Sequence, residues 1–243
     1  TPLYSSAASD VYKRQAPGLE SAHASGPDLA PLPRLGLPTM FRLGLFQMGL
    51  GMMSVLTLGL LNRVMVTELR IPLDLAAGAI AMHQFIAPVR VWFGQLSDAR
   101  PIRGYHRTAY VWLGAVCFAL MSFVAVQAMW QVGAIVPADG PWQWTAVTTP
   151  PALLLGFVFA GYGVAISCSS TPFVALLVDV ADEDQRSKLV GIVWSMLMVG
   201  IVIGAIATGT MLKGLEATSD LATIQASINR LFMILPTIVV GLA

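Results

Sequence analysis

The sequence predicts an all-helical integral membrane protein, because it is strongly apolar, poor in charge and divided into long hydrophobic segments. Of its 243 residues, 56% are hydrophobic and 11% are charged, whereas an average soluble domain has about 25% charged residues. The mean hydropathy is +0.72. The formal net charge of +1 gives no basic excess for nucleic acid.

Six segments are long and apolar enough, or nearly so, to cross a bilayer core, which takes about 20 residues of helix. They are, in chain order, Met40–Val66, Leu75–Leu96, Ala109–Gln131, Ala152–Val178, Leu189–Leu212 and the stretch from near Ile228 to Ala243. The sixth stops before it has comfortably crossed, so we expect the chain to be truncated in or near it. Pro88 predicts a kink in the second segment. The expected six-span bundle covers residues 39–243.

Two stretches precede the first span. Ser5–Gln15 resembles the in-frame translation of a transposase sequencing adapter, so we expect Thr1–Gln15 to be a non-native tail. Residues 16–38 are rich in proline, glycine, serine and alanine and lack periodicity, which predicts a disordered arm.

Cations are concentrated in two connections. The loop after the second span holds Arg100, Arg103, His106 and Arg107, and the loop after the fourth span holds Arg186 and Lys188. The positive-inside rule then predicts that both loops and the N-terminus are cytoplasmic.

The first and fourth spans share a glycine pattern. Gly44–Gly51 reads GLFQMGLG and Gly156–Gly163 reads GFVFAGYG, with glycine at the same three offsets. This pattern is typical of close helix packing, and it also predicts a three-plus-three inverted repeat.

The connection GQLSDARPIRGYHR, Gly94–Arg107, resembles the signature loop of the major facilitator superfamily. Gly94, Leu96 and Asp98 match the signature, whereas Ala99 replaces its usual cation and the later glycine and arginines are displaced. The resemblance implies a charge network that includes an acid at the end of the fourth span and latches the two halves of a transporter. Here its members would be Gly94, Asp98, Arg100, Arg103, Arg107, Asp179 and Arg186.

Four further stretches identify a branch of that superfamily. GLLNRVMVTELRIP (59–72), APVRVWFGQLSD (87–98), RTAYVWLG (107–114) and a long stretch over 175–205 resemble the bacteriochlorophyll-delivery, or PucC-like, family. The resemblance implies a twelve-span protein, of which this chain is the N-terminal half. It also implies a carrier or assembly factor that handles (bacterio)chlorophyll as cargo and meets light-harvesting antenna polypeptides. With the predicted orientation, the expected location is a bacterial inner membrane, either cytoplasmic or photosynthetic.

Polar side chains at membrane depth are candidates for binding pigment or substrate, because they are expensive there. The candidates are His83, Arg90, Gln47, Asn62 and Arg63. His83 could bind the magnesium of a chlorin and Arg90 an acid or a pigment carbonyl. A satisfied polar pair within the bundle is the competing interpretation, and for Arg63 the competing interpretation is snorkelling to the interface.

Catalytic motifs are missing from the sequence. It holds no Walker loop, no HExxH, no paired-cysteine metal site and no nucleophile elbow. We therefore expect no enzyme, no metal site and no catalytic residues. Besides a pigment carrier, two alternatives stay open: an ion- or proton-coupled transporter of a small solute, and a pigment-free scaffold for antenna assembly.

Overall fold

The computed structural model describes residues 34–102, 104–137, 141–216 and 221–242, and within these ranges the chain is helical without a strand. The adapter-like tail and most of the expected N-terminal arm lie outside the described residues. Arg103, one of the expected network cations, also lies outside them. At the start of the described part, the Leu35 N–H donates to Gln185 Oε1 over 2.8 Å.

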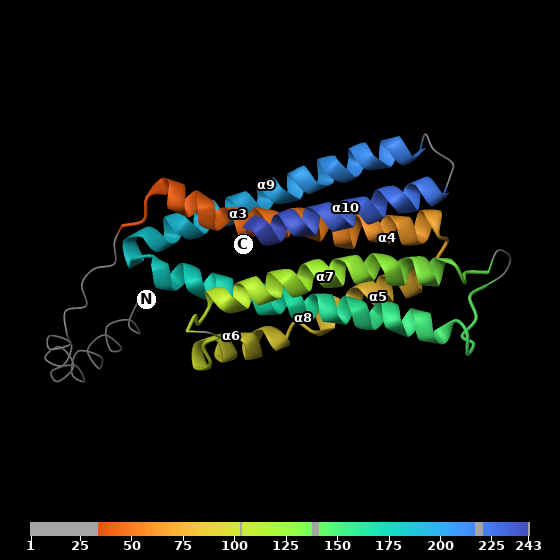
Figure 1. Ribbon diagram of the computed structural model, residues 1–243, viewed down its shortest axis with the longest axis horizontal. Coiled ribbons are helices and arrows are strands. Elements are labelled where there is room, and N and C mark those ends of the chain that lie inside the picture. Colours follow the sequence, from red (N-terminus) through yellow and green to blue (C-terminus); the bar gives the residue numbers. More distant parts are fainter. Residues whose placement is uncertain (1–33, 103, 138–140, 217–220, 243) are drawn as a thin grey trace, which may run out of the picture. The chain divides into compact units, whose positions relative to one another are not determined.

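The helices follow the expected segments with somewhat longer bounds (Figure 1). Apolar residues dominate every one of them, and proline begins the first and fourth spans at the positions where its missing N–H is harmless. The elements are α3 (Leu37–Ser54), η1 (Val55–Leu60), α4 (Leu61–Arg63), η2 (Val64–Glu68), α5 (Leu73–Phe85), α6 (Val89–Ala99), α7 (Thr108–Gly133), α8 (Thr149–Val180), α9 (Glu183–Glu216) and α10 (Leu221–Leu242).

Five continuous helical stretches are long and apolar enough to span a membrane, among the residues that the structure describes. The expected second span is not one of them, because the chain forms turns at Ile86–Pro88 and divides it into α5 and α6. The kink expected at Pro88 is therefore a complete break. The sixth span begins at Leu221 rather than near Ile228, so α10 has 22 residues and reaches spanning length.

The first span is not a uniform α-helix. Two π-helical stretches, η1 and η2, flank the single turn α4. Hydrogen bonds from residue i to i+5 widen these turns. Nothing in the sequence pattern predicted them.

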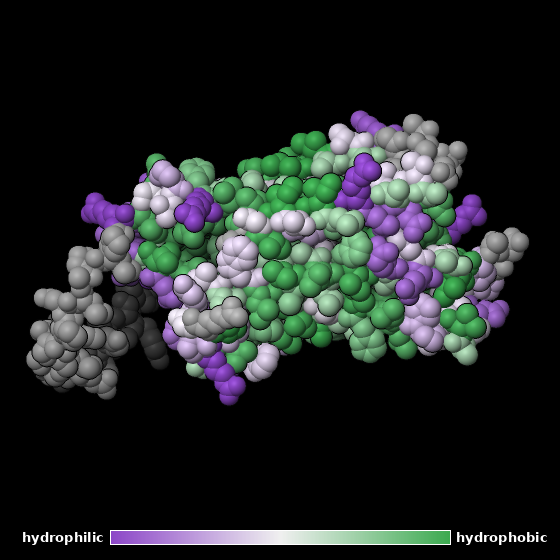
Figure 2. Space-filling view, viewed as in Figure 1, coloured by the Kyte–Doolittle hydropathy of each residue, from purple (hydrophilic) through white to green (hydrophobic). Residues whose placement is uncertain are grey.

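The helices pack in two groups that meet along α7 and α10. α3 runs along α9 and also meets α10, whereas α8 packs on α5, α6 and α7, and α7 joins α10. In Figure 1, α3, α9 and α10 lie along one side, and α5, α6 and α8 lie along the other. The interior is aromatic, with Phe46, Phe118, Phe159 and Tyr162 fully buried. Figure 2 shows an apolar belt across the middle of this bundle and hydrophilic side chains towards its ends.

Glycines let two helix pairs approach closely. A Cβ at Gly163 of α8 would come within 2.6 Å of the His83 carbonyl oxygen of α5. On the other side, Gly51 of α3 lies against the Leu197 backbone of α9, and Gly200 and Gly204 of α9 lie against Met48 and Met52. Gly200 and Gly204, spaced as in a GxxxG pair, therefore serve close helix packing.

Candidate functional site

The structure places two of the candidate residues in one cavity of about 590 Å³, here called the Arg90 cavity. Helices α3, α6, α7, α8 and α9 contribute to its wall. Exposed side chains on its rim, among them Arg90, Val174 and Trp194, open it to the surface of this chain. The lining residues are Gln47, Leu50, Ser54, Arg90, Val91, Phe118, Tyr162, Ile166, Ser170, Thr171, Val174, Trp194 and Leu197.

Most of this lining is apolar, and several of its polar atoms lack partners. Gln47 Oε1 and the Tyr162 hydroxyl are buried without a hydrogen bond in the described part of the chain. Thr57 interacts with Tyr162, yet its hydroxyl is also without a hydrogen bond of good geometry. A mostly apolar concave surface with a few polar groups is the usual character of a small-molecule site.

His83 lies next to this cavity and not in its wall. Its Nδ1 hydrogen-bonds to the Ile80 carbonyl oxygen one turn earlier, and its ring meets the Tyr162 ring edge-on at 6.3 Å. Because a carbonyl only accepts, Nδ1 donates the proton of this bond, so Nε2 is the ring nitrogen that has a lone pair in the neutral imidazole. The break at Pro88 puts His83 and Arg90 on separate helices; His83 meets Tyr162 directly, and Arg90 shares the cavity lining with Tyr162.

Asn62 and Arg63 are not brought to this cavity. They lie in α4, between the two π-helical stretches of the first span. Asn62 is half-buried, and Arg63 and Glu68 are exposed. The structure therefore separates the five candidates into a group of three around Tyr162 and a pair elsewhere on the first span.

Arg107 joins two acids at one end of the bundle, here called the charged end. Its guanidinium is 3.1 Å from an Asp98 carboxylate oxygen and 2.8 Å from an Asp179 carboxylate oxygen. Asp98 is in the last turn of α6 and Asp179 in the last turn of α8. One cation before α7 thus ties the ends of two other helices.

The other expected members that the structure describes lie near the charged end without joining these ion pairs. The Arg100 carbonyl accepts a hydrogen bond from the Tyr110 hydroxyl over 2.9 Å. Arg186 donates to the Val178 carbonyl over 3.4 Å. A Cβ added to Gly94 would lie 3.5 Å from the Thr171 side chain, so α6 lies beside α8 at this position.

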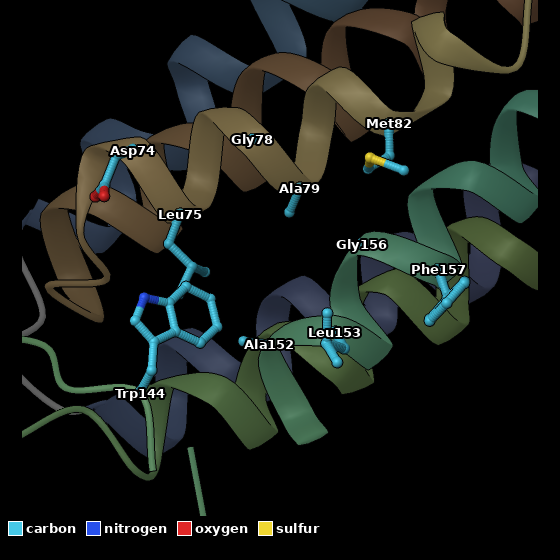
Figure 3. Close-up of a pocket in the computed structure, with 10 residues that line it drawn as sticks. All are labelled: Asp74, Leu75, Gly78, Ala79, Met82, Trp144, Ala152, Leu153, Gly156 and Phe157. Atoms are coloured by element: carbon cyan, nitrogen blue, oxygen red, sulfur yellow. The ribbon is translucent and has the colours of Figure 1, made fainter. Parts of the chain in front are cut away.

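A second cavity of about 290 Å³ lies between α5 and the first half of α8. Figure 3 shows Asp74 at one end of it and Met82 and Phe157 towards the other, with the Trp144 indole standing near Leu75. Its walls are otherwise apolar. Asp74 is in the first turn of α5, where an acid also complements the positive end of the helix.

Sequence reasoning missed Tyr162 and Trp194, which line the Arg90 cavity from α8 and α9. Tyr162 occurs within the repeated glycine pattern, so the sequence placed it in a closely packed helix. The sequence did not show which residues would surround it. Ser167, Ser169 and Ser170 hydrogen-bond to carbonyl oxygens of their own helix. This is a common behaviour of serine within a helix. No cluster of three or more metal-ligating side chains occurs among the described residues.

Comparisons with known proteins give a family and no structural template. The family described as "PUCC protein" matches residues 60–242. "Protein PucC" of Rhodovulum sulfidophilum is 31% identical over 214 residues, and "Protein PucC" of Rhodobacter capsulatus is 35% identical over 181 residues. "Bacteriochlorophyll synthase 44.5 kDa chain" of Rhodobacter capsulatus is 32% identical over 179 residues. No solved structure matches the chain.

The matches cover most of this chain but less than half of each relative. They include 86%, 72% and 73% of the chain, against 44%, 37% and 38% of the three relatives. The chain therefore spans about two fifths of the length of the curated relatives it matches. With the family matched over residues 60–242 and a relative 35% identical, this membrane chain belongs to the PUCC protein family.

Proposed function

We propose that this protein carries (bacterio)chlorophyll, or helps to install it, during the biogenesis of light-harvesting complexes. The observation that carries the proposal is the family membership, together with a relative whose printed name refers to bacteriochlorophyll. The pigment would be held in the Arg90 cavity, between this chain and the rest of the protein, and released to an antenna polypeptide. No step of this mechanism is enzymatic.

The shape and chemistry of the Arg90 cavity support this assignment. A chlorin is a large, flat and mostly apolar ring with a few polar groups on its edge. Leu50, Phe118 and Val174 offer apolar surface, and Gln47 and Arg90 offer polar contacts. The open rim suits a cargo that enters and leaves sideways, and the remaining length of the relatives suits a second wall.

His83 supports the pigment assignment through its tautomer. A histidine that ligates a metal usually donates its other ring N–H to a carbonyl or carboxylate, which fixes the ring. The Nδ1 hydrogen bond to Ile80 is of this kind. It leaves Nε2 as the nitrogen that would bind the magnesium of the pigment, beside the Tyr162 ring.

The same proposal takes the chain as the N-terminal half of a major facilitator fold with a three-plus-three repeat. Equivalent glycines of the two repeated segments make equivalent contacts, which supports this view. Gly44 and Gly51 of α3 meet Met196 and Leu197 of α9, and Gly156 and Gly163 of α8 meet Met82 and His83 of α5. In each repeat, the two residues that the glycines contact are consecutive in the sequence.

The ion pairs of Arg107 support the further proposal that the charged end is a latch. A latch of this kind holds one conformation and opens when the charges separate. By the positive-inside rule, the charged end and the N-terminus face the cytoplasm. The protein would then lie in the inner membrane, with antenna polypeptides as its partners.

An absorption spectrum tests the proposed function. The protein is produced at the full length of its gene in a pigment-making host and purified in mild detergent beside His83→Ala. We expect chlorin absorption in the wild type and its loss or a shift in the variant. The matched control is Asp74→Asn, which removes a charge from the second cavity and should leave the spectrum unchanged.

Two results would contradict parts of the proposal. A folded but colourless wild type would favour a pigment-free scaffold or a transporter of another solute. Pigment retained unchanged in His83→Ala would keep the carrier and remove the ligand role of His83. Folding is judged separately, from a single symmetric peak in size-exclusion chromatography.

A further inference from the structure

Arg90 is a cation in α6, beside the membrane-spanning helix α8, and it has no counterion among the described residues. It lies in α6, eight residues before Asp98, which places it about 12 Å along the helix from the charged end. It makes no ion pair in the part of the chain that the structure describes. The lining of the Arg90 cavity contains no aspartate or glutamate.

Charge balance in a membrane demands a partner for such a group. An unpaired guanidinium is costly at this depth and faces either a partner or a water-filled space. Two acids of the charged end, Asp98 and Asp179, are both held by Arg107. Among the described residues, Arg90 forms an ion pair neither with these two acids nor with the acidic run 182–184 at the start of α9.

We infer that the occupant of the Arg90 cavity brings the missing negative charge as a carboxylate. This rests on the proposed function for pigment handling in the Arg90 cavity, and it changes the cargo from the esterified pigment to its free-acid precursor, which would be released for esterification before the pigment reaches an antenna polypeptide. The apolar walls take the ring, and the guanidinium binds the carboxylate with two parallel hydrogen bonds, a geometry for which arginine is suited. Delivery of this cargo would precede the esterification of the pigment.

The geometry of the cavity allows both contacts at once. Arg90 and Trp194 stand on the rim, whereas Phe118 and Tyr162 lie deeper, so one ligand can meet the cation at the surface and the aromatic wall inside. Trp194 is 52% exposed. Its fluorescence therefore reports when a pigment covers it.

Binding of two metal-free pigments, pheophorbide a and its methyl ester, tests the inference. The pair differs in charge and hardly in size, and the missing magnesium removes any contribution from His83. Quenching of Trp194 fluorescence gives both affinities for the full-length protein in mild detergent, with Trp194→Phe to identify the signal. The ratio of the two affinities is compared between the wild type and Arg90→Gln, so that partitioning into detergent cancels.

We expect the wild type to prefer the acid by about tenfold or more, because a hydrogen bond to a charged group is strong. Arg90→Gln should remove this preference, Arg90→Lys should keep part of it, and Asp74→Asn should leave it intact. Equal ratios in wild type and Arg90→Gln would overturn the inference while leaving pigment binding in place. Binding of neither pigment would overturn both the inference and the proposed function.

A counterion from the rest of the protein is the remaining source of negative charge. In that case Arg90→Gln would lower the thermal midpoint of the pigment-free protein and leave the acid-to-ester ratio unchanged. This outcome also overturns the inference. A lowered ratio with an unchanged midpoint supports it, because Arg90 would then act only on the ligand.

Discussion

Gly163 of α8 touches the backbone of His83 in α5, so that a Cβ on Gly163 would lie 2.6 Å from the His83 carbonyl oxygen and 2.9 Å from its Cα. Backbone atoms cannot move aside as a flexible side chain can. The contact therefore fixes the distance between α5 and α8, and with it the place of the His83 ring beside Tyr162.

Gly163→Ala should destabilise the protein, because overpacking a close helix crossing costs about 1–3 kcal/mol. The measurement is the thermal midpoint in mild detergent. Gly191→Ala is the matched control, since nothing lies within 4 Å of a Cβ there and alanine is favoured over glycine in a helix by about 1 kcal/mol. The two variants should shift the midpoint in opposite directions, and a shift in the same direction would contradict the close crossing.

Much of the fold followed from the sequence because bilayer physics leaves few options. Long apolar stretches such as Ala152–Val178 had to form helices that satisfy their own backbone groups, and α8 has nearly those bounds. Pro88 predicted a kink in the second segment. Whether the helix would bend or break there depended on the packing of α5 and α6 against α8. The start of α10 was placed too late, because polar residues such as Gln225 and Asn229 hid seven more residues of apolar helix.

The candidate site was only partly predictable, because a cavity is a property of several helices at once. Gln47 and Arg90 were found as polar residues in apolar spans. Nothing in the sequence showed that they would share a cavity with Tyr162 and Trp194. The signature loop identified the cations of the charged end, but the choice of Arg107 as the one that meets both acids depends on the turn before α7.

Arg107→Gln should lower the free energy of unfolding by about 1 kcal/mol, because it removes both ion pairs of the charged end. Both acids are about half exposed, with side-chain exposures of 58% for Asp98 and 50% for Asp179, so solvent screens much of the attraction. The loss should shrink at high salt. Thermal midpoints at low and high ionic strength measure it, with Arg100→Gln as the control that leaves both ion pairs intact.

A double-mutant cycle separates the ion pairs from other effects of removing Arg107. Asp179→Asn should make Arg107→Gln less damaging, because residues in one ion-pair network are not additive. If the two losses simply add, Arg107 and Asp179 do not interact in the folded protein.

Asn229 should anchor α10 to α7, because its Oδ1 accepts two hydrogen bonds, from Gln127 Nε2 at 3.1 Å and from Trp130 Nε1 at 3.2 Å. Asn229→Leu leaves two donors without an acceptor and should cost about 1 kcal/mol. The thermal midpoint measures this, with the exposed Gln225→Leu of the same helix as the control. Equal effects of the two substitutions would contradict the anchoring role.

Tyr162→Phe should separate stability from pigment binding. In the described part of the chain, the Tyr162 hydroxyl is buried without a hydrogen bond of good geometry, although Thr57 interacts with it, so its removal takes away a poorly satisfied polar group and should leave the thermal midpoint unchanged or raise it. Tyr110→Phe is the matched control, because its hydroxyl donates to the Arg100 carbonyl over 2.9 Å. That loss should cost about 1 kcal/mol.

The chlorin content of the two variants should change in the opposite order from their thermal midpoints. Tyr162 lines the Arg90 cavity and its ring meets the His83 ring edge-on, so we expect a chlorin that enters the cavity to uncover its buried hydroxyl and bind it, whereas Tyr110 lies outside the cavity lining. We expect less chlorin per protein in Tyr162→Phe and an unchanged content in Tyr110→Phe, measured by absorption after purification. A lower midpoint in Tyr162→Phe would show that the hydroxyl has a structural partner, and the unpaired group would then no longer argue for a ligand.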